Sequence, residues 1–348
     1  MKRFDYSFLD RGLLPARIFN MTTSIYSLKT TASIRKDENL KIFKEMESIA
    51  KIQSIKSSNA IEGIVTSDER IKAIVSQSSA PLNHNESEIA GYRDVLNEIH
   101  TNFKNIAFNE KNILRLHEIM LSQAGYEYGG QYKEIDNCIM EIDIYGNRKV
   151  RFAPVSAEET SKAMEQLVLA YIDASNNSNI NQLLLIPCVI LDFLCIHPFS
   201  DGNGRMSRLL SLLLLYKNDF DAGKYVSFEE QINKYKDRYY EALRLSSIGW
   251  HENKNDYSPF MENFLSVLYM CYKELNKRFS VVNGKILNKS QRIEDTILNS
   301  IVPMSKAEIC SVLPDVSPTT VESVLGKLVK QGRIEKIGVA RNIRYLRK

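Results

Sequence analysis

The sequence has little that would place it in a membrane, in a secretory compartment or among disulfide-bonded proteins. Its longest apolar run, residues 183–196, contains Pro187 and Asp192 and is too short to cross a bilayer. The basic residues near the N-terminus precede no unbroken apolar stretch, so we expect no signal peptide. The five cysteines include no Cys-x-x-Cys pair, and their odd number favours reduced thiols. These absences predict a cytoplasmic protein without a membrane partner.

Metal-binding patterns are also scarce, and the net charge is small. His84, His100, His117 and His251 show no metal-ligand spacing, and we assign them no role. The chain carries a net charge of +4, but residues 289–348 alone hold 11 Lys or Arg against 6 Asp or Glu. The rest of the chain is therefore nearly neutral. A basic segment attached to a neutral body suggests a nucleic-acid partner, and a solvated basic face is the alternative.

Helical periodicity dominates the rest of the chain. Hydrophobic residues make up 44% and charged residues 25%, as in an ordinary globular protein, and 348 residues predict two or three domains. Ile42, Met46 and Ile49 begin a stripe at three- and four-residue spacing that predicts a helix over residues 41–62. The same spacing predicts helices within residues 112–121, 161–172, 205–216, 235–246 and 258–275. We therefore expect a mainly α protein.

Residues 136–154 break this helical pattern. Cys138, Met140 and Ile142 begin an alternation of positions that is typical of a strand. A Gly-Asn pair at 146–147 then favours a turn into a second strand. This segment predicts a β-hairpin, which would have to pack on the helical body because an isolated hairpin is only marginally stable.

Residues 284–348 predict a separate small domain. Ser305 and Glu308 have the spacing of a capping box at the start of a helix. Two short strands joined near Gly338 end the domain. The order of helix, helix, helix and hairpin resembles a winged-helix domain, with residues 319–330 in the place of the recognition helix. DNA binding and a protein–protein or dimerisation role are equal alternatives for this domain.

The most polar stretch of the chain, residues 197–208, lies between two of its most apolar segments. Gly202, Asn203 and Gly204 can adopt turn conformations in which successive backbone N–H groups converge on one anion. A helix beginning near Arg205 would direct its positive N-terminal end to the same point. The stretch therefore predicts an anion site, although Gly-Asn-Gly alone would more often be a simple turn.

Four side chains around this turn add chemistry that suits a polyphosphate. Arg205 and Arg208 share one face of the predicted helix and can hold phosphate oxygens together. Asp201 can bind Mg²⁺ that is also bound to those phosphates. His197, whose unperturbed pKa would be about 6.5, is placed to act as a general base. Each side chain alone would more often be solvated or a helix cap, but their convergence on one loop favours a phosphate site.

The segment HPFSDGNGRMSR, residues 197–208, resembles the signature of the Fic family, HPF-x-D/E-GNGR-x-x-R, at every specified position. The resemblance extends over about residues 40–275, including GGQYKE at 129–134 and the predicted hairpin, which looks like the family's flap. It implies a Fic-type helical bundle with a β-hairpin flap. The expected domains are an N-terminal helical region at 1–110, a Fic catalytic core at 111–283 with its flap at 136–154, and a winged-helix-like domain at 284–348.

The resemblance implies adenylylation, in which AMP passes from ATP to a Ser, Thr or Tyr hydroxyl of a target protein docked on the flap. By position, His197 would take the proton of that hydroxyl, and Asp201 would bind Mg²⁺. Tyr239 and Tyr240 would line the adenine, although both would also fit as core or surface residues. The family also allows a homodimer. The ATP-binding residues that the resemblance implies are Gly202, Asn203, Gly204, Arg205, Met206, Ser207, Arg208, Tyr239 and Tyr240.

A second match lies nearer the N-terminus. The pattern Ser58-x-x-x-Glu62-Gly63 resembles the family's inhibitory motif, S/T-x-x-x-E-G/N. The resemblance implies that Glu62 pairs with Arg208 and withholds it from the γ-phosphate of ATP, while Ser58 helps to hold the helix in place. Without the resemblance, Glu62 would be an exposed acid at a helix end, and Gly63 a stop signal.

Two alternatives to a self-inhibited adenylyltransferase stay open. The same fold could remove AMP or transfer another nucleotide. Phosphorylation is disfavoured, because kinase-like relatives carry GNK where this chain has GNGR, with Arg205. In the other alternative, the protein is a DNA-binding regulator whose winged helix carries the function and whose Fic body senses a nucleotide.

Overall fold

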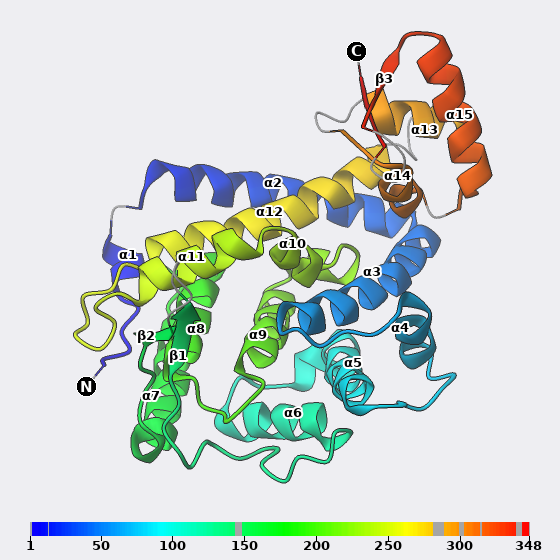
Figure 1. Ribbon diagram of the computed structural model, residues 1–348. Coiled ribbons are helices and arrows are strands. Elements are labelled where there is room, and N and C mark those ends of the chain that lie inside the picture. The colour runs from blue at the N-terminus through cyan, green and yellow to red at the C-terminus, as the bar shows by residue number, and fades with distance from the viewer. Residues whose placement is uncertain are drawn as a thin grey trace. The chain divides into compact units, whose positions relative to one another are not determined.

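The computed structural model describes residues 2–12, 14–142, 148–280, 289–298, 303–313, 315–338 and 343–347. The chain forms two compact units, Met1–Tyr272 and Lys273–Lys348. Within the described ranges the protein is mainly helical and contains two small antiparallel sheets of two strands each (Figure 1). The predicted mainly α fold with a hairpin is confirmed. No helix in the described ranges is long and apolar enough to span a membrane.

The first half of the first unit is a series of helices that ends before the hairpin. They are α1 (Phe8–Arg11), α2 (Ala16–Glu38), α3 (Leu40–Ile61), α4 (Asp68–Val75), α5 (His84–Asn102), the 3₁₀ turn η1 (Phe103–Asn105) and α6 (Glu110–Ser122). The helix predicted over 41–62 corresponds to α3. It ends at Glu62 because Gly63 adopts a positive φ of 81°, a conformation that glycine reaches without the steric cost of a side chain.

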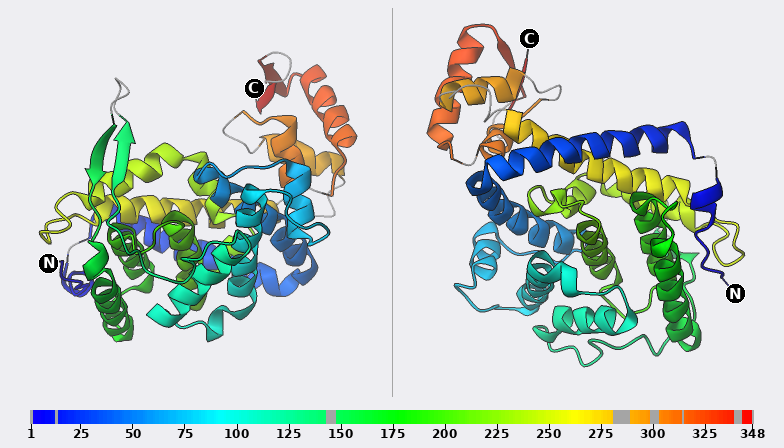
Figure 2. Two further views of the ribbon diagram at one scale, coloured as in Figure 1. Left: turned by 60° about the horizontal axis from the view of Figure 1, so that its bottom comes forward. Right: turned by 180° about the vertical axis from the view of Figure 1, so that it is seen from behind.

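The second half of the unit contains its most buried helices. It comprises α7 (Ala157–Asn176), α8 (Gln182–Ile196), α9 (Asn203–Lys217), the 3₁₀ turn η2 (Ala222–Lys224), α10 (Phe228–Lys234), α11 (Lys236–Ser247) and α12 (Ser258–Ser280), of which the last continues into the second unit. Helix α8 is buried from Leu183 to Ile196, and α9 is buried from Arg205 to Tyr216. Helix α9 packs against α8, α5 and α3 in the interior (Figures 1 and 2). The polar loop between α8 and α9 is thus held by the two most enclosed helices.

The predicted hairpin consists of β1 (Ile139–Ile142) and β2 (Arg148–Phe152), which pair antiparallel and project from the helices (Figure 2). The predicted turn at 146–147 lies outside the described residues. Pairing shifts along the hairpin: Ile139 lies opposite Phe152, but Met140 lies opposite Val150. Arg151 therefore has no partner on β1, which is the arrangement of a β-bulge.

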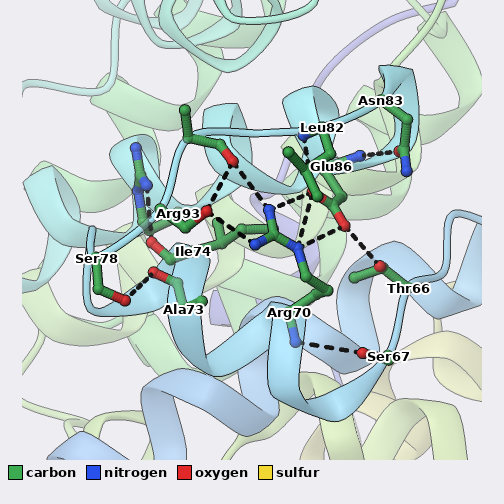
Figure 3. Close-up of polar contacts among 12 residues, drawn as sticks. Thr66, Ser67, Arg70, Ala73, Ile74, Ser78, Leu82, Asn83, Glu86 and Arg93 are labelled. Carbon is green, nitrogen blue, oxygen red and sulfur yellow. Dashed lines mark hydrogen bonds and ion pairs between the residues drawn. The ribbon is translucent and has the colours of Figure 1, made fainter.

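The segment between Gly63 and α5 is fixed by one buried carboxylate, that of Glu86 (Figure 3). The Arg70 guanidinium donates to it, with Nη2 lying 2.6 Å from Oε2. Thr66 donates its hydroxyl to Oε1 at 2.9 Å, and the backbone N–H of Leu82 donates to Oε2 at 2.9 Å. Arg70 also donates to Ser79 and to the carbonyl of Ala80. Glu86 thus ties α4 and both flanking loops to the first turn of α5.

The second unit consists of α13 (Lys289–Leu298), α14 (Lys306–Val312), α15 (Pro318–Lys330), β3 (Ile334–Ile337) and β4 (Arg344–Arg347). Its core is aliphatic and includes Ile293, Ile309, Leu325 and Ile334. The predicted capping box of Ser305 and Glu308 is present. The order of three helices and a hairpin is the predicted one, while the winged-helix identity of this unit stays a prediction.

Candidate active site

A cavity of about 300 Å³ in the first unit contains most of the predicted site residues. Glu62, His197, Asp201 and Arg208 all line it, together with the turn from Gly202 to Arg205. The hairpin contributes Cys138, Ile139, Arg151 and Phe152, and α11 contributes Tyr239, Tyr240, Leu243 and Ser247. The structure thus brings together residues that are up to 185 positions apart in the sequence, from Glu62 to Ser247.

Two predicted ATP-binding residues, Met206 and Ser207, do not line this cavity. Met206 is fully buried in the core, and the hydroxyl of Ser207 donates to the carbonyl of Gly204 at 2.8 Å. Their side chains serve the packing and the first turn of α9, and their contact with ATP stays a prediction. Ser58 and Gly63 do not line the cavity either.

His197 ends α8 in a left-handed backbone conformation, with φ 52° and ψ 61°. This conformation is uncommon for a residue with a side chain, and such residues are frequent at functional sites. The Nδ1–H of the ring donates to the carbonyl of Leu194 at 3.3 Å. Because a carbonyl can only accept, this contact fixes the tautomer and leaves Nε2 as the basic nitrogen.

Burial lowers the pKa of His197 to about 4, and the positive charge of Lys133 acts in the same direction. The carboxylates of Glu62 and Asp201 and the bond to Leu194 oppose this shift without cancelling it. The imidazole is therefore neutral near pH 7 and can accept a proton.

The turn before α9 differs in one respect from the prediction, because α9 begins at Asn203 and not near Arg205. Gly202 has a positive φ of 79°, and the side chain of Asn203 bonds back across the turn. The backbone N–H of Phe199 donates to its Oδ1 at 2.9 Å, and its Nδ2 donates to the carbonyl of Phe199 at 2.7 Å. Asn203 thus shapes the turn, and both ends of its carboxamide already have a partner. Only the backbone N–H of Asn203 therefore remains for the predicted contact with phosphate.

Arg208 is buried and held by the end of α3. Its Nη2 donates to Glu62 Oε1 at 2.8 Å and to the Ser58 carbonyl at 2.9 Å, and its Nε donates to the Ser58 hydroxyl at 2.8 Å. A Cβ on Gly204 would collide with the same Glu62 oxygen. The carboxylate of Glu62 therefore lies against the first turn of α9, where a negative charge is stabilised by the free N–H groups of the helix.

Arg205 is also buried and lies between two carboxylates. Its Nη1 lies 2.5 Å from Glu88 Oε2, and its Nη2 lies 3.2 Å from Asp201 Oδ2. The Asp201 side chain is 52% exposed and lines the cavity, so it can take a further ligand. In the described residues, no cluster of three or more His, Cys, Asp or Glu could hold a metal ion. One partly exposed carboxylate fits Mg²⁺, which proteins often bind through one or two carboxylates while phosphates and water complete its coordination.

His117, a buried residue of α6 to which the sequence assigned no role, fixes the backbone of the site. The backbone N–H of Gly130 donates to its Nδ1 at 3.1 Å, so its Nε2–H donates to the carbonyl of Asp201 at 3.1 Å. The ring stacks on Phe199, with centroids 3.7 Å apart and planes inclined by 8°. Burial lowers the pKa of His117 to about 4, which keeps it neutral. No local pattern could have indicated this role, because its partners are distant in sequence.

Lys133 and Asn137 form a second support that sequence analysis missed. The backbone N–H of Lys133 donates to the carbonyl of Pro198 at 2.9 Å, and its Nζ donates to the carbonyl of Ile196 at 3.2 Å. The side chain of Asn137 accepts from Lys133 Nζ at 2.8 Å and donates to the carbonyl of Phe199 at 3.1 Å. These residues brace the backbone on both sides of His197. The GGQYKE segment at 129–134 was the available signal.

Comparison with known proteins identifies the family of the central part of the chain. Residues 107–215 match the model of the Fic/DOC family. A Fido domain-containing protein of Dictyostelium discoideum is 28% identical over 138 residues, which cover 40% of this chain and 90% of that protein. Protein adenylyltransferase Fic of Nematostella vectensis is 26% identical over 221 residues, which cover 61% of this chain. The chain spans 45% of the length of this second relative.

Solved structures share the fold at low sequence identity. A Fic family protein from Desulfovibrio desulfuricans has a TM-score of 0.63 and 19% identity, with 97% of both chains covered. A Fic domain containing signaling protein from Bacteroides thetaiotaomicron has a TM-score of 0.60 and 21% identity, covering 74% of this chain and 97% of its own. Fic-1 from C. elegans has a TM-score of 0.60 and 18% identity, and the match covers 76% of this chain and 73% of that chain. Residues 107–215, which include both the His197 loop and the hairpin, therefore form a Fic/DOC family domain, and the chain shares the fold of solved Fic proteins.

Proposed function

We propose that the protein is a self-inhibited adenylyltransferase that transfers AMP from ATP to a Ser, Thr or Tyr hydroxyl of a target protein, and to itself. The observation that carries this proposal is the shared cavity, which is lined by His197, with its basic Nε2, and by Arg205, Arg208 and the start of α9. The name of the Nematostella relative supports the same reaction.

The arrangement supports an in-line transfer at the α-phosphorus of ATP. Nε2 of His197 accepts the proton of the target hydroxyl as its oxygen attacks, and pyrophosphate leaves. The N–H groups at the start of α9 and the two arginines hold the phosphate oxygens and offset the charge that develops there. Mg²⁺, when bound with the nucleotide at Asp201, would neutralise phosphate charge.

The hairpin would position the target. Its outer surface exposes the apolar side chains of Met140 and Val150, and an extended segment of a partner can add to a strand edge through main-chain hydrogen bonds. Such pairing would hold the hydroxyl near His197 and convert a bimolecular encounter into an oriented one.

The contact between Glu62 and Arg208 supports self-inhibition. The carboxylate occupies the guanidinium that would otherwise bind the γ-phosphate, and the two bonds from Ser58 hold Arg208 against α3. Hydrogen bonds to charged groups contribute about 1.5–3 kcal/mol each, so this clamp is strong enough to keep most molecules inactive.

Labelling with ATP tests the proposal. With α-labelled ATP and Mg²⁺, the Glu62→Gly variant should label itself and lysate proteins about 10-fold or more above the wild type, because Arg208 is released. γ-Labelled ATP should leave no label. His197→Ala, added to Glu62→Gly, should abolish the labelling.

Glu69→Gly, which removes an exposed carboxylate from the nearby helix α4, serves as the matched control and should behave as the wild type. Equal labelling by the wild type and Glu62→Gly would contradict self-inhibition. Loss of label from a pre-adenylylated protein, in place of its gain, would show that the enzyme removes AMP.

A further inference from the structure

Arg151 of the hairpin is directed into the cavity by the bulge in β2. It has no residue opposite it on β1, because pairing passes from Phe152 to Val150, and its side chain lines the cavity. A β-bulge changes the direction of a side chain and is frequent next to active sites. The hairpin thus contributes a third arginine to a cavity that already contains Arg205 and Arg208.

Arg151 differs from these two arginines in lacking an anionic partner. Arg205 lies against Glu88 and Asp201, and Arg208 is bound by Glu62. Among the described residues, Arg151 makes no ion pair, and its Nε is buried without any hydrogen-bond partner. A buried donor without an acceptor is costly, so an unpaired guanidinium in a cavity favours an anionic ligand at that place.

We propose that Arg151 binds the phosphate chain of the nucleotide from the hairpin side of the cavity; this inference rests on the proposed function. The ligand must enter the cavity, because a protein lying on the outer face of the hairpin would not reach the buried Nε. A guanidinium matches two phosphate oxygens through parallel N–H bonds, whereas a nucleobase carries no negative charge to offset.

This contact would connect the two substrates. The hairpin is the element proposed to hold the target, and Arg151 would fix it to the bound nucleotide. Arg151 is also free while Glu62 holds Arg208, so it can bind a nucleotide in the inhibited protein.

Calorimetry on the Glu62→Gly protein tests the inference with three probes: Mg²⁺–ATP, tripolyphosphate and adenosine. Adding Arg151→Met should lower the affinity for ATP and for tripolyphosphate by about 10-fold or more, because charge-assisted hydrogen bonds are lost. The affinity for adenosine should stay unchanged. Arg151→Lys keeps the positive charge but not the planar guanidinium. Its affinity for ATP and tripolyphosphate should lie between those of the Glu62→Gly protein and of the protein that also carries Arg151→Met. Thermal unfolding of each variant checks that the fold is retained.

Arg244→Met is the matched control, since Arg244 lies on the cavity-lining helix α11, pairs with Glu241 and does not itself line the cavity. It should bind all three probes as the Glu62→Gly protein does. An unchanged affinity for ATP in Arg151→Met would overturn this inference but not the proposed function. A loss of affinity confined to ATP and adenosine, with tripolyphosphate binding unchanged, would do the same. Failure of the Glu62→Gly protein itself to bind ATP would overturn the proposed function, and the inference with it.

Discussion

At the scale of single residues, His197 combines a left-handed backbone conformation with a lowered pKa. Its left-handed φ ends α8 and turns the chain into the polar loop, and its bond to Leu194 selects the tautomer with a basic Nε2. Burial beside Lys133 keeps the ring neutral. A histidine base here was predictable from the sequence, but its tautomer and its pKa were not, because they depend on neighbours that only the fold brings together.

The low pKa of His197 predicts how the reaction depends on pH. Because the neutral form is the base and the pKa is about 4, the rate of AMP transfer by Glu62→Gly should not fall between pH 8 and pH 5.5 through this group, and should fall as the pH approaches 4. Initial rates with α-labelled ATP measure this profile, and circular dichroism on the same samples confirms that the protein stays folded. A half-maximal rate near the unperturbed value of about 6.5 would contradict the prediction.

At the scale of elements, the first turn of α5 supports two parts of the site. Glu86 binds Arg70, Thr66 and the backbone of Leu82, and so fixes the chain that leaves Glu62. Two residues later, Glu88 pairs with Arg205 of α9. These side-chain contacts join residues that are distant in sequence and could not be predicted from it, whereas the helix α3 and the hairpin follow directly from their apolar spacing.

The Glu86 network predicts a pH-dependent stability. The bonds from Arg70, Leu82 and Thr66 lower the pKa of Glu86 to about 2, below its unfolded value of about 4.3. Its carboxylate therefore stabilises the fold above about pH 4.3 and loses this contribution as the pH falls toward 2. Glu86→Gln should unfold at a lower temperature than the wild type at pH 7, and the difference should shrink by pH 3.

Thermal unfolding across pH measures this effect, with Glu45→Gln on the exposed side of α3 as the control. The control should match the wild type at each pH. A difference between Glu86→Gln and the wild type that is equally large at pH 7 and pH 3 would contradict the electrostatic origin.

At the scale of the whole molecule, the chain joins a large unit that contains the Fic-matched residues to a small basic unit. The hairpin of the first unit and the order of elements in the second were predictable, because caps, alternation and turn residues mark them locally. Helix α2 was not predicted, since its apolar residues do not follow one stripe: Phe19 and Ile34 are exposed. His117 was likewise given no role, because its contacts with Gly130 and Asp201 exist only in the folded chain.

We propose DNA as the partner of the second unit, and this proposal predicts a separation of functions. Lys327 is exposed on α15, so Lys327→Glu should weaken retention on duplex DNA while labelling by α-labelled ATP stays as in the parent protein. Binding by the parent should also fall steeply with added salt, because phosphate contacts release counterions. Gel-shift titrations at two salt concentrations measure both effects.

Lys72→Glu, at an exposed position of α4, makes the same change of charge in the first unit and should leave DNA retention intact. Equal weakening by both variants would indicate a non-specific effect of net charge. Absence of any retention by the parent would favour a protein partner for this unit.

Because Arg205 and Arg208 already hold carboxylates, the resting cavity supplies its own counter-ions. A nucleotide that enters must exchange one anion for another at each of these positions. The free energy it gains there is the difference between two ion pairs, so modest changes in either carboxylate can shift occupancy over a wide range. On the proposed function, small displacements of α3 or α5 would therefore adjust the site without any change in the loop that carries His197.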